Sequence, residues 1–189
     1  MSASHVSAFD VFPLLAVTRV RVVLDAGFYA RVLNVFGGII GAVPIDKSAG
    51  ASTRAQVHAA AVDTNGAPML FFPEGWDTNG RCLLRFNRFV FSVGVPVVPV
   101  ALSAAVVGLP LVPGMLGSNL VRELCWLFFA PMTSWTVTVG STLVRDNGES
   151  PEAFAQRAQH AVGKLNGAVP SGWTDRDALK LRRGLMARD

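Results

Sequence analysis

The middle of the chain contains a long segment without a single charged residue, from Phe89 to Val121. A segment of this length is long enough to span a lipid bilayer as a helix. It contains four prolines, however, and each would remove a backbone hydrogen-bond donor from such a helix. Part of the segment, VPVVPVAL at positions 95–102, has the density of β-branched residues that is typical of a buried strand. The segment therefore predicts strands and turns rather than a membrane span.

Helix-like and strand-like segments alternate along the chain. Helices are expected at 11–17, 27–36 and 52–62, and strands at 18–24, 39–46 and 67–72. A further strand is expected at 134–144. It is followed by a helix with Ser150-Pro151 at its start and Asn166-Gly167 near its end. Alternation of this kind predicts an α/β fold in which helices flank a central, mostly parallel or mixed sheet.

The length of the chain, 189 residues, suits one domain with a sizeable core and is too short for two comfortable ones. We expect this domain to occupy residues 1–170. A last helix, begun by Thr174 and Asp175, is rich in basic residues. Residues 171–189 are therefore expected to form a basic C-terminal helix.

The composition favours contact with lipid and with an anionic partner. Hydrophobic residues make up 51% of the chain and charged residues only 16%, which is apolar for a soluble protein. The net charge of +4 favours phospholipid head groups, a phosphorylated cofactor or nucleic acid. The basic residues are dispersed until the last helix and are not interleaved with aromatic ones, so we expect no nucleic acid as a partner.

A second apolar segment, ELCWLFFAPM at positions 123–132, is too short to cross a bilayer. Trp126, Phe128 and Phe129 lie close together in it, which suits a helix in the membrane interface. A plain core helix is the alternative interpretation.

The segment FFPEGWDTNGRCLLRF, from Phe71 to Phe86, takes the chain directly from a hydrophobic strand into Pro-Glu-Gly. Polar groups at the end of a buried strand face a crevice rather than the core. Glu74 is therefore expected to be either a site residue or an ordinary loop residue.

The three histidines differ in their surroundings. His58 and His160 lie in predicted helices without acidic or cysteine neighbours at ligand spacing, and they are expected to be ordinary helix residues. His5 stands five positions before Asp10, and a tight turn brings such a carboxylate onto the imidazole, where it holds the tautomer and stabilises the imidazolium. The alternative is that Asp10 merely caps the helix and His5 is an exposed terminal residue.

Four short segments, in their order and at their distances, resemble the four sequence blocks of the glycerolipid acyltransferase family, which includes lysophosphatidate and lysophosphatidylcholine acyltransferases. These segments are HVSAFD, GAVPIDK, FFPEGWDTNGRCLLRF and VPVVPV. This resemblance extends from the start of the chain to about Leu102. The later half is similar to the acyltransferase-like region of the ancient ubiquitous protein family, which is associated with lipid droplets and the endoplasmic reticulum.

The resemblance implies a role for each matched residue. His5 would be the general base that takes the proton from an acceptor hydroxyl, Asp10 would orient it, and the hydroxyl would attack the thioester of acyl-CoA. Acyl-CoA would be a substrate, with no metal and no bound cofactor. The implied substrate-binding residues are Lys47 for a phosphate, Phe72, Pro73, Glu74 and Gly75 for the glycerol backbone, Thr78 and Asn79 in the same block, and Pro99 for the acyl site.

The chain also departs from the family pattern. Trp76 and Phe89 stand where small residues are usual and Asn87 where lysine is frequent, so we expect a narrower or blocked pocket; Ser4 stands where asparagine is usual. Met1 lies only four residues before His5. The hydrophobic N-terminal anchor and the strand leading to the histidine are therefore expected to be missing, which predicts an N-terminally truncated domain.

Two functional hypotheses follow. The first is an acyl-CoA-dependent acyltransferase acting on a lysophospholipid or glycerol phosphate lipid, at the cytosolic face of the endoplasmic reticulum membrane or a lipid droplet. The second is a non-catalytic adaptor of the same membranes that retains the fold. The first is preferred because the His5–Asp10 pair and Glu74-Gly75 are intact, and a scaffold has no physical need for them.

Overall fold

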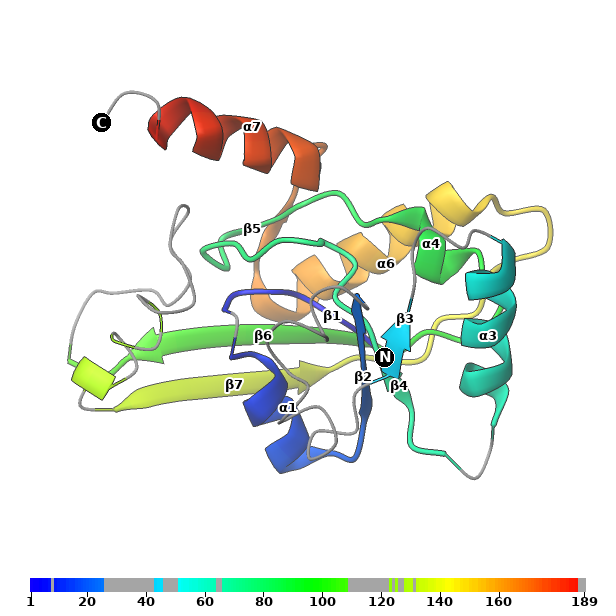
Figure 1. Ribbon diagram of the computed structural model, residues 1–189, viewed down its shortest axis with the longest axis horizontal. Coiled ribbons are helices and arrows are strands. Elements are labelled where there is room, and N and C mark those ends of the chain that lie inside the picture. The colour runs from blue at the N-terminus through cyan, green and yellow to red at the C-terminus, as the bar shows by residue number, and fades with distance from the viewer. Residues whose placement is uncertain are drawn as a thin grey trace.

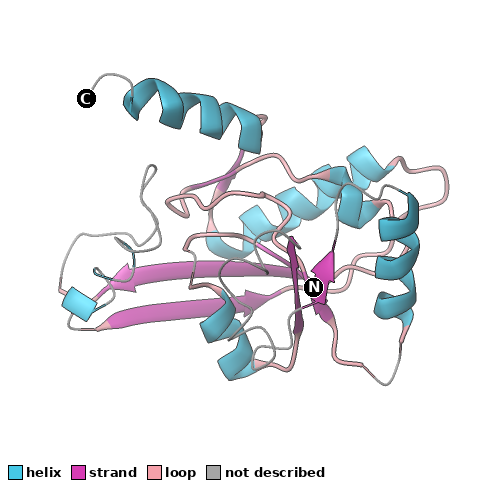
Figure 2. Ribbon diagram, in the orientation of Figure 1, coloured by secondary structure: helices cyan, strands magenta, loops and turns pink. Residues whose placement is uncertain are grey.

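The computed structural model describes residues 1–7, 9–25, 43–45, 51–63, 66–108, 123, 125, 128–130 and 132–186. It confirms the predicted α/β fold, with a mixed sheet and helices around it (Figures 1 and 2). The helices are α1 (Val11–Val17), α3 (Ala51–Val62), α4 (Arg88–Phe91), α6 (Pro151–Asn166) and α7 (Asp175–Met186). The strands are β1 (Ser2–Ala3), β2 (Arg21–Asp25), β3 (Val43–Ile45), β4 (Met69–Leu70), β5 (Cys82–Leu83), β6 (Pro99–Val106), β7 (Thr133–Val139) and β8 (Val169–Pro170).

Two three-stranded sheets meet in the middle of the molecule. One has the order β1-β6-β7, with β1 parallel and β7 antiparallel to β6. The other has the order β3-β2-β4 and is parallel. A parallel bridge between Ser2 and Phe71 joins them, and the Ala3 amide donates to the Phe71 carbonyl at 2.9 Å. Through these contacts β1 lies between β4 and β6, in the interior of one mixed layer.

The strand β6 separates two hydrophobic cores. Val100 and Leu102 pack with Leu14 of α1, whereas Ala101 packs with Phe154 of α6. Since successive side chains of a strand point to opposite faces, α1 and α6 cover opposite faces of the sheet. The segment that follows β1 enters α1 and is held against the sheet by the first of these cores.

The helix α6 forms as the sequence predicts. The Ser150 hydroxyl accepts a hydrogen bond from the Ala153 amide at 3.1 Å, Pro151 occupies the first turn, and Gly167 ends the helix with φ 74°. Phe154, Ala158 and Val162 recur every four residues and are buried. Burial of one large apolar side chain of this kind stabilises the fold by about 1.5–3 kcal/mol.

Several predicted elements differ from the structure in length or position. The strand predicted at 67–72 is only Met69–Leu70, and the strand predicted at 18–24 lies at Arg21–Asp25. The helix predicted at 27–36 lies outside the described residues. None of the helices in the described part of the chain has both the length and the apolar character that crossing a bilayer would require.

The expectation that no strand leads to the histidine is wrong. Ser2 and Ala3 form β1, in register with Pro99 and Val100 of β6. The Ser4 amide continues the pairing by donating to the Val100 carbonyl at 3.1 Å. A strand of two residues can form here because β6 on one side and Phe71 on the other supply partners for its backbone hydrogen bonds.

The last part of the chain is tied to the segment around β5. β8 pairs in parallel with β5, and the Arg85 amide donates to the Trp173 carbonyl at 2.7 Å. α7 extends from this point along the edge of the molecule (Figure 1). A boundary between 1–170 and 171–189 stays a prediction.

Candidate active site

His5 and Asp10 lie on the short connection between β1 and α1. The imidazole Nδ1 is 2.7 Å from Asp10 Oδ2, and the Val6 amide donates to the same oxygen at 2.7 Å. Asp10 is fully buried, and its side chain makes no capping hydrogen bond to α1. The alternative in which Asp10 merely caps the helix is therefore wrong, because its carboxylate turns back to His5.

The tautomer of His5 follows from this contact. An ionised carboxylate only accepts hydrogen bonds, so Nδ1 carries the proton and Nε2 keeps its lone pair. Burial disfavours the charged imidazole, but the hydrogen bond and charge of Asp10, with smaller effects of Asp77 and Glu74, outweigh it and raise the pKa of His5. The His5 side chain is 22% exposed, so the ring can meet a substrate.

Phe72 fixes the imidazole from one side. Its ring stacks on His5 with centroids 4.6 Å apart and an interplanar angle of 29°. An aromatic wall at this distance limits rotation of the imidazole and keeps water away from one face. Phe72 was a predicted substrate-binding residue, and the structure places it beside the base.

Glu74 is buried in the turn that follows β4. Its Oε1 accepts from the His5 amide at 2.8 Å and its Oε2 from the Leu84 amide at 2.9 Å, with only 1% of the residue exposed. Burial raises the pKa of Glu74 to about 7, although both hydrogen bonds oppose this shift. In this structure Glu74 positions His5, and its predicted contact with the glycerol backbone stays a prediction. Gly75 permits the turn, since its φ is 72°.

Thr78 also fixes the backbone of His5. Its amide donates to the His5 carbonyl at 2.9 Å, and its hydroxyl donates to the Cys82 carbonyl at 3.1 Å. On the other side, the Ser4 hydroxyl accepts from the Leu102 amide at 2.8 Å. With Glu74, these contacts fix the backbone nitrogen and the backbone oxygen of His5, so the base sits on a rigid support.

Four further residues were predicted to belong to the site, namely Pro73, Asn79, Pro99 and Lys47. Pro73 is buried and its carbonyl accepts from the Asn87 amide at 2.8 Å, whereas Asn79 is exposed. Pro99 starts β6 in register with Ser2, and its carbonyl accepts from the Gly140 amide. Lys47 lies outside the described residues.

An acidic pair that the sequence did not suggest borders the dyad. The Ser7 hydroxyl donates to Glu123 Oε2 at 3.0 Å, and the side chains of Asp77 and Glu123 share a hydrogen bond. Burial raises the pKa of Asp77, the charge of His5 opposes this, and Glu123 adds to it. Ser7 and Asp77 stand inside two of the quoted blocks, but nothing near Glu123 in the sequence indicates that it reaches them.

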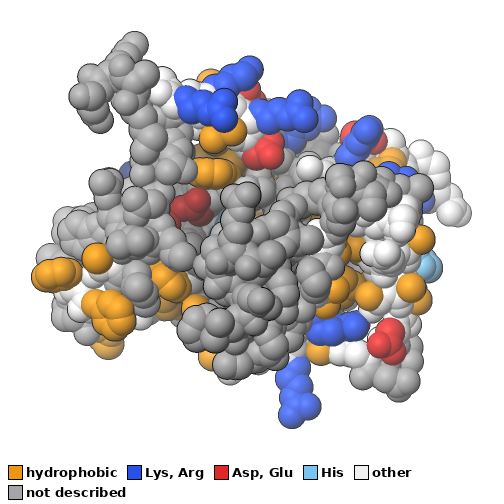
Figure 3. All heavy atoms as spheres, in the orientation of Figure 1, with side chains coloured by type: hydrophobic (Ala, Val, Ile, Leu, Met, Phe, Trp, Pro, Cys, Tyr) orange, Lys and Arg blue, Asp and Glu red, His pale blue; other side chains and the backbone are white. Residues whose placement is uncertain are grey.

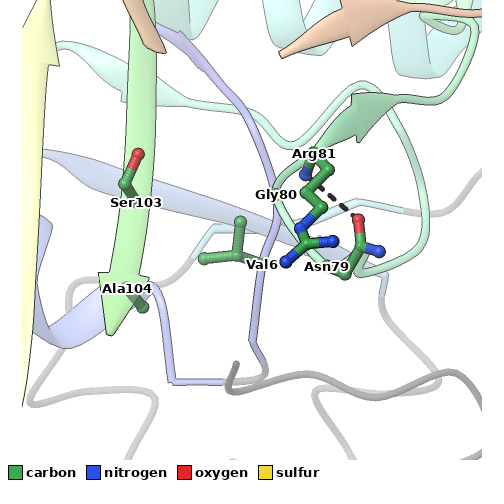
Figure 4. A pocket seen from close by; sticks show the side chains of 6 residues that line it. All are labelled: Val6, Asn79, Gly80, Arg81, Ser103 and Ala104. Atoms are coloured by element: carbon green, nitrogen blue, oxygen red, sulfur yellow. Dashed lines mark hydrogen bonds between the residues drawn. The ribbon is translucent and has the colours of Figure 1, made fainter. Parts of the chain in front are cut away.

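A hollow of about 200 Å³ lies beside the His5 loop (Figure 4). It is bounded by the end of β6 on one side and by the turn after Thr78 on the other. Its lining residues are Val6, Asn79, Gly80, Arg81, Ser103 and Ala104. Among the residues that the structure describes, no group of three or more His, Cys, Asp or Glu side chains is arranged to hold a metal ion.

The half-buried His5 pairs with the fully buried Asp10, and Glu74 at the end of a neighbouring strand supports it; such an arrangement can serve general-base chemistry on a hydroxyl. A family model described as Acyltransferase matches residues 1–103. The chain therefore belongs to the acyltransferase family, and the resemblance drawn from the four blocks is confirmed.

Curated relatives fall into two groups. The Lipid droplet-regulating VLDL assembly factor AUP1 of Xenopus laevis is 40% identical over 114 residues, which cover 59% of this chain and 28% of that protein. The same factor of Mus musculus is 38% identical over 112 residues, covering 58% and 27%. Glycerol-3-phosphate acyltransferase 3 of Gallus gallus is 24% identical over 191 residues, covering 90% and 40%. The chain thus spans less than half the length of these relatives. No solved structure matches it.

Proposed function

We propose that this chain transfers a fatty acyl group from acyl-CoA to the hydroxyl of a lysophospholipid or glycerol phosphate lipid. The observation that carries this proposal is the 2.7 Å contact between His5 Nδ1 and buried Asp10, which leaves the other ring nitrogen, Nε2, to act as the base. Membership of the acyltransferase family and the similarity to glycerol-3-phosphate acyltransferases support it.

The proposed reaction needs only protein side chains and two substrates, with no metal and no bound cofactor. Nε2 of His5 takes the proton of the acceptor hydroxyl as its oxygen attacks the thioester carbonyl of acyl-CoA. The tetrahedral intermediate then collapses, the carbon–sulfur bond breaks, and the leaving thiolate takes the proton back from the imidazolium. Asp10 stabilises that imidazolium, and Glu74 and Thr78 hold the backbone of His5.

The surface supports a membrane location, which we propose to be the endoplasmic reticulum or a lipid droplet, on the cytosolic face. Phe128 and Phe129 are 80% and 82% exposed, and Met132 is 59% exposed. Figure 3 shows hydrophobic side chains over the far ends of β6 and β7, and Lys and Arg side chains over α7. Apolar side chains that enter the interface and cations that meet anionic head groups together favour a protein that lies on the membrane.

The direct test is an assay on vesicles with labelled acyl-CoA and a panel of lysophospholipids and glycerol 3-phosphate. We expect His5→Ala to reduce transfer by about 10²- to 10⁴-fold, the range of a positioned general base, while the variant still folds. His58→Ala is the matched control, because His58 is exposed on α3 away from the dyad. Equal activity of the wild type and His5→Ala would overturn the catalytic proposal.

The second candidate is a non-catalytic adaptor of lipid droplets or the endoplasmic reticulum. It is favoured by the similarity of this chain to a lipid droplet-regulating factor, at higher identity than to the acyltransferases. On this alternative, the wild type shows no transfer with any acceptor of the panel, and the His5→Ala form binds lipid droplets normally. Assays of transfer and of droplet binding with the wild type and His5→Ala therefore distinguish the two candidates.

A further inference from the structure

Ser7 lies at the centre of the loop that returns Asp10 to His5. It is 2% exposed, its carbonyl accepts from the Asp10 amide at 3.1 Å, and its hydroxyl accepts from the Phe9 amide at 3.2 Å. Hydrogen bonds of this kind between near neighbours define a turn. The contact between the imidazole and its carboxylate therefore depends on where Ser7 is held.

Glu123 fixes Ser7 from a distant part of the chain. The Ser7 hydroxyl donates to Glu123 Oε2 at 3.0 Å, across 116 positions of sequence. A hydroxyl has a single proton, so this bond leaves the oxygen of Ser7 free to accept from the Phe9 amide. Glu123 is half-buried, and hydrogen bonds to carboxylates are stronger than those between neutral groups.

Glu123 also contacts the turn on the other side of His5. Its side chain shares a hydrogen bond with Asp77. Asp77 directly precedes Thr78, whose amide donates to the His5 carbonyl at 2.9 Å. The two hydrogen bonds of Glu123, to Ser7 and to Asp77, thus connect the two segments that meet at the His5 backbone. We call these two bonds the Glu123 link.

The bond between the two carboxyl groups requires a proton. An ionised carboxylate only accepts hydrogen bonds, so one of the two groups must be protonated. Burial raises the pKa of Asp77, and Glu123 raises it further, whereas the charge of His5 opposes the shift. Asp77 therefore keeps the proton, and Glu123 accepts from both Asp77 and Ser7.

The place of Glu123 in the chain shows what the link connects. Glu123 begins the apolar segment at positions 123–132. Phe128 and Phe129, five and six positions further on, are 80% and 82% exposed, and they are the side chains proposed to enter the membrane interface. One residue thus joins the segment proposed to meet lipid to the loop that carries the base.

We propose that Glu123 is a positioning residue, which keeps the loop between His5 and Asp10 in its working geometry and connects it to the exposed apolar segment. Glu123 acts through Ser7 and Asp77 and not on the reacting atoms. Its effect on turnover rests on the proposed function, whereas its effect on the geometry of the loop does not.

The test follows exchange of the His5 Nδ1 proton with solvent, by NMR of the full chain labelled with ¹⁵N in its histidines. The chain has three histidines, and the ring signal missing from His5→Ala identifies His5. We expect this proton to exchange about 10- to 100-fold faster in Glu123→Ala, the range for loss of a hydrogen bond to a charged group. Unchanged exchange in Glu123→Ala would overturn the proposal.

Glu123→Gln is the conservative variant that should keep the link. Its amide oxygen can accept from Ser7, and its NH₂ can donate to Asp77, which then ionises. Glu123→Ala and Glu123→Gln thus remove the same charge and differ in their hydrogen bonds. We expect exchange in Glu123→Gln to stay close to that of the wild type. Equal acceleration in the two variants would contradict a hydrogen-bonded link.

A second pair of variants tests the other end of the link. Asp77→Ala removes the donor to Glu123, whereas Asp77→Asn keeps one in its amide NH₂. We expect faster exchange of the His5 proton in Asp77→Ala and a rate near that of the wild type in Asp77→Asn. This pair decides the question even if Glu123→Ala does not fold.

Two controls separate positioning from general stability. Val162→Ala weakens the core on the opposite face of the sheet, and we expect it to lower the unfolding temperature without changing exchange at His5. Glu152→Ala, which loses an ion pair with Arg88, should also leave that exchange unchanged. If Val162→Ala accelerates exchange as much as Glu123→Ala does, the effect of Glu123 is general stability and the proposal is overturned.

Kinetics on vesicles connect the link to the reaction. We expect Glu123→Ala to lower kcat, by up to about 100-fold if the base moves by about 1 Å, with the acceptor KM little changed and kcat restored in Glu123→Gln. An active wild type whose kcat survives Glu123→Ala refutes the positioning role alone. Faster exchange in Glu123→Ala, with a wild type that transfers no acyl group, supports the link and refutes the proposed function.

Discussion

Burial of Glu74 makes the stability of the protein depend on pH in a direction that one isosteric substitution tests. The folded carboxyl has a pKa of about 7 against an ordinary value of 4.5, because burial outweighs its hydrogen bonds to the His5 and Leu84 amides. Between these two values the unfolded chain has released its proton while the folded chain keeps it. The unfolded state thus binds fewer protons there, and stability must fall as pH rises from 4.5 to about 7.

The size of the effect follows from the shift. A difference of 7 − 4.5 = 2.5 pKa units corresponds to about 3 kcal/mol in total, of which about 2.5 kcal/mol develops between pH 5 and pH 8. Glu74→Gln cannot ionise and keeps the shape of the protonated side chain. We therefore expect the unfolding free energy of Glu74→Gln, relative to that of the wild type, to rise by about 2.5 kcal/mol over this range.

Urea unfolding at several pH values between 5 and 8 measures this difference. Glu152→Gln is the control, because Glu152 is paired with Arg88, which holds its pKa below the usual range, and its variant must show no such rise. A difference between Glu74→Gln and the wild type that stays flat from pH 5 to pH 8 would refute the reasoning. The same variant tests the substrate role predicted for Glu74. If Glu74 positions the acceptor, Glu74→Gln should lower kcat by a larger factor than it raises the acceptor KM.

Four other predictions address the base, the acceptor, the surface and the core. Since His5 acts as a base only when neutral and its pKa is raised, kcat/KM is expected to increase with pH through a midpoint above 6.5, and Asp10→Asn should lower that midpoint in a pH–rate profile. If Lys47 holds the acceptor phosphate, Lys47→Ala should raise the acceptor KM while Lys47→Arg preserves it in two-substrate kinetics. Phe129→Asp is expected to abolish flotation with anionic vesicles, whereas Val144→Asp, at an exposed site elsewhere, should leave flotation intact. Phe154→Ala should lower the unfolding free energy by about 3–5 kcal/mol in urea, because Phe154 is 1% exposed in the core.

The parts of the fold that the sequence predicted are those with a local signal. The helix α6 has a serine cap, an early proline, a four-residue apolar repeat and a terminal glycine, and each acts within a few residues. The strands β1, β5 and β8 have two residues each, which is too short for any periodicity to develop. Their existence depends on partners that are distant in the sequence.

The candidate site divides in the same way. The spacing of His5 and Asp10 indicated a dyad because both residues belong to one loop. The contact of Ser7 with Glu123 joins residues 116 positions apart and has no local signal. Glu74 was noticed because a carboxylate follows a buried strand, but only the structure shows that both its oxygens accept backbone amides.

The contacts that hold His5 have a consequence for the order in which the protein forms. Glu74 binds the His5 amide across 69 positions, and Ser4 binds the Leu102 amide across 98. Closing loops of this length is slow compared with forming a helix such as α6. The chain loses conformational entropy before the stabilising contact between its distant parts can form. A nascent chain therefore cannot assemble the base until β6 has been synthesised. Any fragment that ends before Leu102 should lack an ordered His5, so the order of this residue reports on whether β6 has joined the sheet.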